Sequence, residues 1–190
     1  MPIEAEFKAH VHDPGRVRDW LRERATEEVS TYHDVYFDQP DRSLTRSGRE
    51  LRVRVIESET DTRAVLTYKA PAVDAASASK PEYEADVSDA DSTRAILDGL
   101  GYCVLVAFAK HCRNYRFVSD GRDILATLVT VPELDGTFLE VETITDDDVP
   151  EALATVRAVL TDIGIEDLDI TTEPYADAVI ARRYGPNERP

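Results

Sequence analysis

The stretch Glu4-Ala5-Glu6-Phe7-Lys8 (EAEFK, residues 4–8) alternates charged and apolar side chains one by one. Successive side chains of a β-strand point to opposite faces, so the three charges share one face and the apolar residues share the other. The same alternation returns at 51–55 (LRVRV), at 82–84 (EYE) and at 139–142 (LEVE). The recurrence indicates a sheet with one charged face and one apolar face.

Short segments with a period of two residues dominate the chain and are separated by turn residues, as in a closed antiparallel sheet. Helices are predicted after groups of strands rather than between all of them, which is typical of the α+β class. We expect a single domain over residues 1–183 and a short C-terminal tail over 184–190. The predicted strands are 3–11, 31–37, 51–55, 63–68, 83–87, 102–110, 114–118, 124–131 and 137–143, and the predicted helices are 13–26, 88–100, 149–164 and 174–183.

A sheet that closes on itself has one face toward a lumen and one face outward. The helices need an apolar surface to pack on, so the apolar faces are expected to point outward and the charged faces inward. So many buried ions are costly without ligands. The lumen is therefore expected to hold water, divalent cations, which prefer carboxylate oxygens, and a polyanion bound by Arg and Lys. The predicted inward charges are Glu4, Glu6, Glu82, Glu84, Glu140, Glu142, Lys8, Arg52, Arg54, Lys69, Lys110 and Arg113.

The chain of 190 residues has a net charge of −16, from 38 acidic and 22 basic residues. So acidic a composition indicates a halophilic protein and disfavours nucleic-acid binding, because phosphates would be repelled. The two cysteines, Cys103 and Cys112, are expected to be free thiols. We predict a soluble, cytoplasmic protein without membrane contact, since no signal peptide and no bilayer-spanning apolar stretch is evident.

Several motifs, in order along the chain, resemble the CYTH superfamily, also called triphosphate tunnel metalloenzymes. Its members include class IV adenylyl cyclases of the CyaB type, thiamine triphosphatases and inorganic triphosphatases. The EAEFK segment matches the ExExK signature of this superfamily, and the other matches cover most of the chain. They are DVYFD (34–38), LRVRV (51–55), LTYKAP (66–71), KPEYEADV (80–87), Lys110-x-x-Arg113-x-Tyr115, GTFLEVE (136–142) and EPYADAVI (173–180).

The resemblance implies an eight-stranded antiparallel β tunnel with helices outside. It implies that Mg²⁺ or Mn²⁺ is bound by Glu4, Glu6, Glu140 and Glu142, and that Glu82 and Glu84 are further tunnel acids. The triphosphate would be bound by Lys8, Arg52, Arg54, Lys69, Lys110 and Arg113. Family members also carry an aspartate on the strand before the closing ExE motif. Here Thr127, Val129 or Thr130 stands in that region. Because the aspartate is absent, the sequence does not decide whether a second metal ion is bound.

Within the resemblance, DVYFD and the LRVR spacing favour a cyclase that converts ATP to cyclic AMP and pyrophosphate. The first alternative is a triphosphatase acting on tripolyphosphate, thiamine triphosphate or a nucleotide. The second alternative is a polyphosphate-binding module without turnover. A structural β protein with solvated charges is the remaining hypothesis, under which alanine at Arg52 or Glu140 would change little. A homodimer is expected by analogy with relatives.

Overall fold

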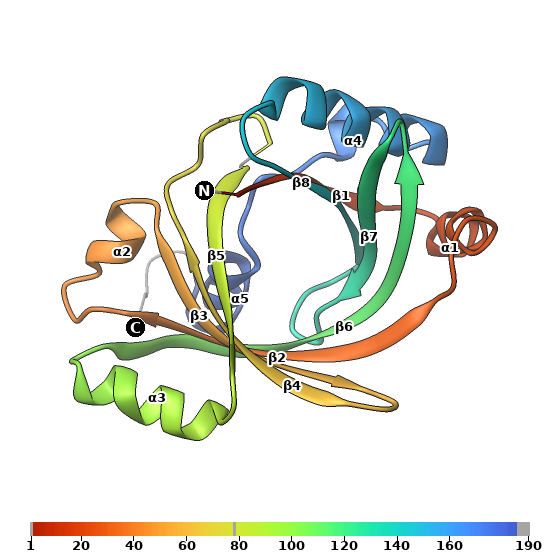
Figure 1. The fold of residues 1–190 in the computed structure, drawn as a ribbon. Helices are drawn as coiled ribbons and strands as arrows, with labels where there is room; N and C mark the ends of the chain where they lie inside the picture. Colours follow the sequence, from red (N-terminus) through yellow and green to blue (C-terminus); the bar gives the residue numbers. More distant parts are fainter. Residues whose placement is uncertain (1, 78, 186–190) are drawn as a thin grey trace.

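The computed structural model describes residues 2–77 and 79–185. Eight antiparallel strands close into a barrel in the order β1-β5-β4-β3-β2-β6-β7-β8 (Figure 1). This confirms the predicted α+β class and the closed eight-stranded barrel. The strands are β1 (Ile3–Val11), β2 (Glu28–Asp38), β3 (Glu50–Ser58), β4 (Thr62–Lys69), β5 (Lys80–Val87), β6 (Cys103–Ser119), β7 (Arg122–Thr130) and β8 (Thr137–Thr145).

Within residues 2–77 and 79–185, five α-helices pack around the barrel: α1 (Pro14–Arg22), α2 (Ser43–Arg46), α3 (Ala90–Gly99), α4 (Val149–Ile163) and α5 (Tyr175–Tyr184). The side chains of Asp13, Asp89 and Asp148 cap the first turns of α1, α3 and α4, as the sequence predicts for helix starts. α2 was not predicted, and it forms where the Asp38 carboxylate accepts backbone hydrogen bonds from Leu44 and Thr45. Residues 186–190 of the predicted tail lie outside the described residues.

The prediction of two separate strands at 102–110 and 114–118 is wrong, because one continuous strand, β6, spans Cys103–Ser119. This strand pairs with β2 over its first part and with β7 over its second, from His111 onward. Its sequence contains no glycine or proline to end it. The continuity fixes which side chains of β6 face inward.

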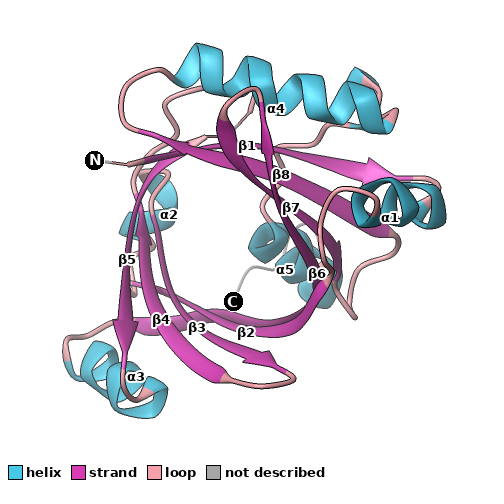
Figure 2. Ribbon diagram, turned by 45° about the vertical axis from the view of Figure 1, so that its right-hand side comes forward, coloured by secondary structure: helices cyan, strands magenta, loops and turns pink. Residues whose placement is uncertain are grey.

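The helices pack on the outer face of the barrel (Figure 2), and the strand side chains beneath them are apolar, as predicted. Phe7, Leu139 and Val141 are buried in one cluster with residues of α1 and α4. Val53 packs with Leu97 of α3 in a second cluster. Such burial is the main favourable term of folding, at about 25 cal/mol per Å² of apolar surface. Among the described residues, no helix is long and apolar enough to cross a membrane.

The interior of the barrel has an apolar half and a charged half. In the apolar half, the rings of Tyr36 and Phe108 stack with centroids 5.7 Å apart, and Phe138 meets Tyr175 edge to face. Tyr175 is the first residue of α5, and it lies in this cluster with Val179 and other α5 residues. α5 therefore covers the apolar half of the lumen.

The barrel closes between β1 and β5 through a short seam, with the register Ile3↔Pro81 and Glu4↔Lys80. Beyond it, the Glu6 amide donates a hydrogen bond to Ser79 Oγ at 3.2 Å. Ser79 is buried and its hydroxyl also contacts that of Ser77. A serine side chain thus satisfies the β1 backbone beside Glu6, which lies in the charged half.

Candidate functional site: a charged barrel cavity

A cavity of about 570 Å³ occupies the charged half of the barrel. Its walls come from all eight strands of the barrel, from the segment that leads into α5 and from the first residue of α5. Of the twelve predicted inward charges, all except Arg113 line it: Glu4, Glu6, Lys8, Arg52, Arg54, Lys69, Glu82, Glu84, Lys110, Glu140 and Glu142. The placement supports the inference that the charged strand faces point inward.

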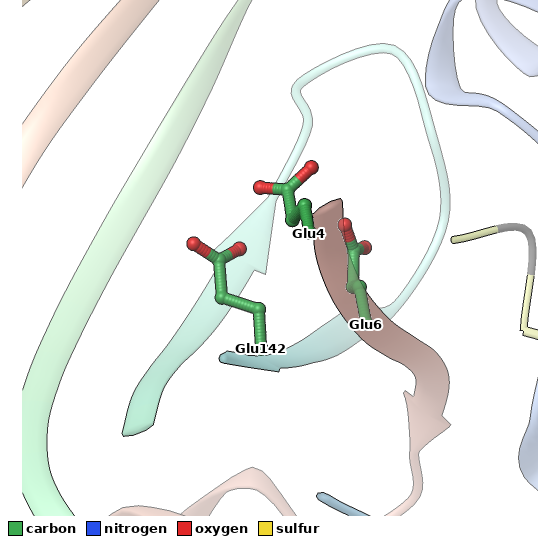
Figure 3. A group of neighbouring side chains, drawn as sticks. All are labelled: Glu4, Glu6 and Glu142. Carbon is green, nitrogen blue, oxygen red and sulfur yellow. The ribbon is translucent and has the colours of Figure 1, made fainter. Parts of the chain in front are cut away.

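Three carboxylates gather on one wall of the cavity. Glu4 and Glu6 come from β1 and Glu142 comes from β8, and one oxygen of each lies within 4.8 Å of the others. Figure 3 shows the three side chains extending into the same region. Glu6 and Glu142 are directly opposite each other in the β1–β8 ladder, so the strand register itself creates the cluster.

The cluster is electrostatically unfavourable by itself. Burial and the charges of Glu4 and Glu140 raise the pKa of Glu6 to about 7. Burial and the charges of Glu4 and Glu6 raise the pKa of Glu142 well above its usual value. Carboxylate oxygens are the ligands that Mg²⁺ and Mn²⁺ prefer, and a cation would offset this repulsion. The residues present therefore fit a divalent cation.

Glu140, the fourth predicted metal ligand, is engaged differently. It lies opposite Lys8 in the ladder, and Lys110 Nζ contacts both of its carboxylate oxygens at 3.3 Å. Burial acts to raise the pKa of Glu140, but Lys110 and Lys8 outweigh it and the pKa is lowered. Glu140 is therefore an ionised partner of two lysines rather than a member of the three-carboxylate cluster.

Most cations of the cavity are paired with acids. Lys69 contacts Glu4 and lies 2.8 Å from Glu82, whose pKa is raised to about 8 by burial and by the charge of Glu4. Arg52 is 7% exposed and has loose contacts with Glu82 at 3.8 Å and Glu84 at 3.6 Å, while its Nε has no partner. Arg52 Nη2 donates a hydrogen bond to Thr67 Oγ1 at 3.2 Å, but the contacts with the acids are longer than good hydrogen bonds, so Arg52 keeps donors without a close carboxylate partner among the described residues.

The strand before the closing ExE motif carries Thr127 at the inward position. Thr127 is opposite Glu140 on β8 and Asn114 on β6, and it donates a hydrogen bond to Asn114 Oδ1 at 3.1 Å. Tyr32 also donates to Asn114 Oδ1. A neutral, hydrogen-bonded network thus stands where the resemblance predicts an aspartate.

Sequence reasoning missed several residues that line this cavity or hold its lining side chains in place. Asp34 on β2 is 1% exposed and accepts two hydrogen bonds from Arg54, at 2.6 and 2.7 Å. The alternation of DVYFD and the register Asp34↔Arg54 are the signals for it, but the register is visible only in the structure. The missed side chains that line the cavity include Glu50, Arg63, Lys80, Arg116 and Tyr175.

The prediction that Arg113 faces the lumen disagrees with the structure. Lys110 and Arg113 are three residues apart on one continuous strand, so their side chains point to opposite faces. Arg113 donates to the Glu27 carboxylate at 2.9 Å, outside the cavity. Arg116 has the parity of Lys110 and does line the cavity.

Glu27 organises the outer face at this point, and its neutralisation should lower stability. Its carboxylate accepts hydrogen bonds from Arg18, Arg22 and Tyr115 as well as from Arg113. We expect Glu27→Gln to lower the free energy of unfolding by about 2–3 kcal/mol at pH 7, since hydrogen bonds to charged groups are lost. Urea denaturation measures this value.

The same contacts predict a pH dependence. The Arg18 hydrogen bond lowers the pKa of Glu27 most strongly, against the effect of burial. A lowered folded pKa contributes stability above the unfolded value near 4.5, and this contribution is lost as the pH falls below it. The difference between wild type and Glu27→Gln should therefore shrink between pH 7 and pH 3. A difference in the free energy of unfolding that stayed constant over this pH range would contradict the prediction.

Comparisons with known proteins agree with this fold. The family model of the CYTH domain matches residues 2–175. The chain is 26% identical over 179 residues to a candidate adenylate cyclase of Methanocaldococcus jannaschii, covering 92% of this chain and 97% of the relative. It is 27% identical over 180 residues to adenylate cyclase CyaB of Aeromonas hydrophila, covering 91% and 86%.

Solved structures show the same architecture. A Pyrococcus horikoshii protein superposes with a TM-score of 0.83 and 27% identity, covering 95% of this chain and 99% of that chain. A candidate adenylyl cyclase from Hippeastrum with a dominant triphosphatase activity has a TM-score of 0.68 and 17% identity, covering 100% of both chains. At that identity the second likeness concerns the fold.

Proposed function

The chain belongs to the CYTH domain family, and from this premise we propose that it is a divalent-cation-dependent adenylyl cyclase that converts ATP to cyclic AMP and pyrophosphate. One observation carries the proposal: a single cavity joins a three-carboxylate cluster to a set of buried lysines and arginines. Carboxylates bind hard cations, and the guanidinium and ammonium groups bind phosphate oxygens. A metal-chelated triphosphate satisfies both halves of this arrangement.

The paired charges of the cavity indicate how its residues would receive such a substrate. Lys69 is paired with Glu4, and Lys110 is paired with Glu140. When Glu4 binds a cation together with Glu6 and Glu142, Lys69 loses its partner and becomes available to a phosphate oxygen. Mg²⁺ or Mn²⁺ would supply charge neutralisation on the phosphates. Binding thus exchanges ion pairs instead of burying new charges, which limits the desolvation cost.

The chemistry requires positioning and charge stabilisation from the side chains. The ribose 3′-hydroxyl releases its proton to water and its oxygen forms a bond to the α-phosphorus, while the bond from that phosphorus to the pyrophosphate oxygen breaks. Arg52, with its unused donors, and the freed Lys69 would stabilise the charge that develops on pyrophosphate. No side-chain nucleophile is needed for this reaction.

A triphosphatase is the second candidate, in which water attacks the γ-phosphorus. The Hippeastrum protein with dominant triphosphatase activity favours it, since its fold is the same. A binding module without turnover is favoured by Thr127 and Asn114, which are neutral where a further metal-binding carboxylate was expected. The three candidate functions use the same cavity and differ in the products that they release.

Product analysis distinguishes these functions. The protein is incubated with ATP and Mn²⁺, and the products are separated by anion-exchange chromatography. We expect cyclic AMP and pyrophosphate in equal amounts, both absent when EDTA is added. Orthophosphate with ADP would instead identify a triphosphatase, and unchanged ATP despite measurable binding would identify a binding module.

A further inference from the structure

We propose that a second cavity, which opens beside the carboxylate cluster between β7 and β8, binds the nucleoside base of the substrate, and that the Arg116 side chain stacks on this base. The inference rests on the proposed function and names a substrate class for it: a triphosphate that carries a planar heterocycle, rather than bare tripolyphosphate. It makes Arg116 a specificity-determining residue.

The second cavity measures about 680 Å³ and adjoins the first. Arg116, Leu125, Glu142 and Ile144 line both cavities, so the two spaces meet at these side chains. Glu142 belongs to the carboxylate cluster, and a phosphate held there would place the attached nucleoside at the junction. Pockets of about 300–1,000 Å³ are typical of small-molecule sites.

The cavity exists because two strands separate. The β7–β8 ladder ends at the pair Leu125↔Glu142, although β7 begins at Arg122 and β8 continues to Thr145. Past this pair, Thr143 Oγ1 donates to the Asp123 carbonyl at 2.7 Å. The backbone groups of residues 122–124 and 143–144 that face each other therefore form no β-ladder hydrogen bonds with each other. Such backbone groups can pair with the polar edge of a base and fix its orientation.

Arg116 lies at the junction with an uncommitted charge. The ladders place it in one cross-strand row with Leu125, Glu142 and Glu6, next to the carboxylate cluster. Arg54, Lys69 and Lys110 are paired with acids, whereas Arg116 forms no ion pair with any residue of 2–77 or 79–185. A guanidinium plane stacks well on aromatic rings and bases. Leu125 and Phe117 add apolar surface for a base beside it.

The test compares two matched probes that resist cleavage. One is ATP with both bridging oxygens of its triphosphate replaced by methylene groups, and the other is the triphosphate analogue with the same replacements and no nucleoside. Isothermal titration calorimetry with Mg²⁺ measures both dissociation constants for wild type, Arg116→Ala, Arg116→Lys and Arg113→Ala. Arg113→Ala is the matched control, because it removes the same charge from the outer face of the same strand.

We expect Arg116→Ala to weaken the nucleotide probe about tenfold, the lower end of base-stacking effects, and the triphosphate probe less than twofold. Arg116→Lys should not restore nucleotide affinity, since a lysine lacks the planar group. Equal weakening of both probes, or rescue by lysine, would show that Arg116 binds phosphate and would overturn the inference. So would unchanged affinity for both probes. If wild type binds neither probe, the proposed function fails as well.

Discussion

Replacement of Glu142 by glutamine is expected to lower ATP turnover about 100- to 1,000-fold. Glu142 joins Glu4 and Glu6 in the cluster that fits a divalent cation. A bound metal ion supplies several kcal/mol of transition-state charge stabilisation, and each 1.4 kcal/mol corresponds to a factor of ten in rate. Steady-state kinetics with ATP and Mn²⁺ measures the loss, and an electron paramagnetic resonance titration of Mn²⁺ measures the weaker binding.

The variant should remain folded, because it removes repulsion among three carboxylates rather than an ion pair. Thermal unfolding without metal should give a melting temperature no lower than that of wild type. Glu57→Gln is the matched control: it also neutralises a strand glutamate, but Glu57 is exposed and pairs with His33 outside the cavity. If Glu142→Gln kept wild-type turnover and wild-type Mn²⁺ affinity, the three-carboxylate cluster would not be part of the active site.

Replacement of Asp34 by asparagine is expected to lower the free energy of unfolding by about 3–5 kcal/mol, the range measured when one partner of a buried ion pair is removed. The Asp34 carboxylate holds Arg54 through two short hydrogen bonds and lies 3.8 Å from Arg52. These arginines hold the pKa of Asp34 well below its usual value, against the opposing effect of burial. Asparagine keeps the shape and leaves the Arg54 guanidinium without its carboxylate partner, while Arg52 retains only its longer contacts with Glu82 and Glu84. Urea denaturation at pH 7 measures the change.

Tripolyphosphate should restore part of this stability, because its oxygens can replace the missing carboxylate beside Arg54. The increase in melting temperature on adding tripolyphosphate is thus expected to be larger for Asp34→Asn than for wild type. Asp86→Asn is the control: Asp86 pairs with Arg63 at 3.5 Å on the surface, where such pairs contribute less than about 1 kcal/mol. Equal losses in the two variants would show that burial of the pair is unimportant.

Strand alternation made much of the site predictable. The inward direction of Glu4, Glu6 and Lys8 follows from the pleat of one strand, which is a local property. The same reasoning correctly placed Arg52 and Arg54, and it placed Phe7 and Val53 on the outer face. It failed at Arg113, because the assumed turn after Lys110 does not exist and a continuous strand reverses the expected direction.

The sequence by itself determined that the chain forms a barrel of α+β class with an ionic interior, because side-chain alternation and turn residues act over a few neighbouring positions. Only the tertiary structure decided which of these charges meet. Glu142 rather than Glu140 joins Glu6 because the β1–β8 register sets them opposite each other, and Asp34 meets Arg54 for the same reason. Register depends on hydrogen bonds between segments far apart in the chain, and a shift of one residue reverses every facing pair.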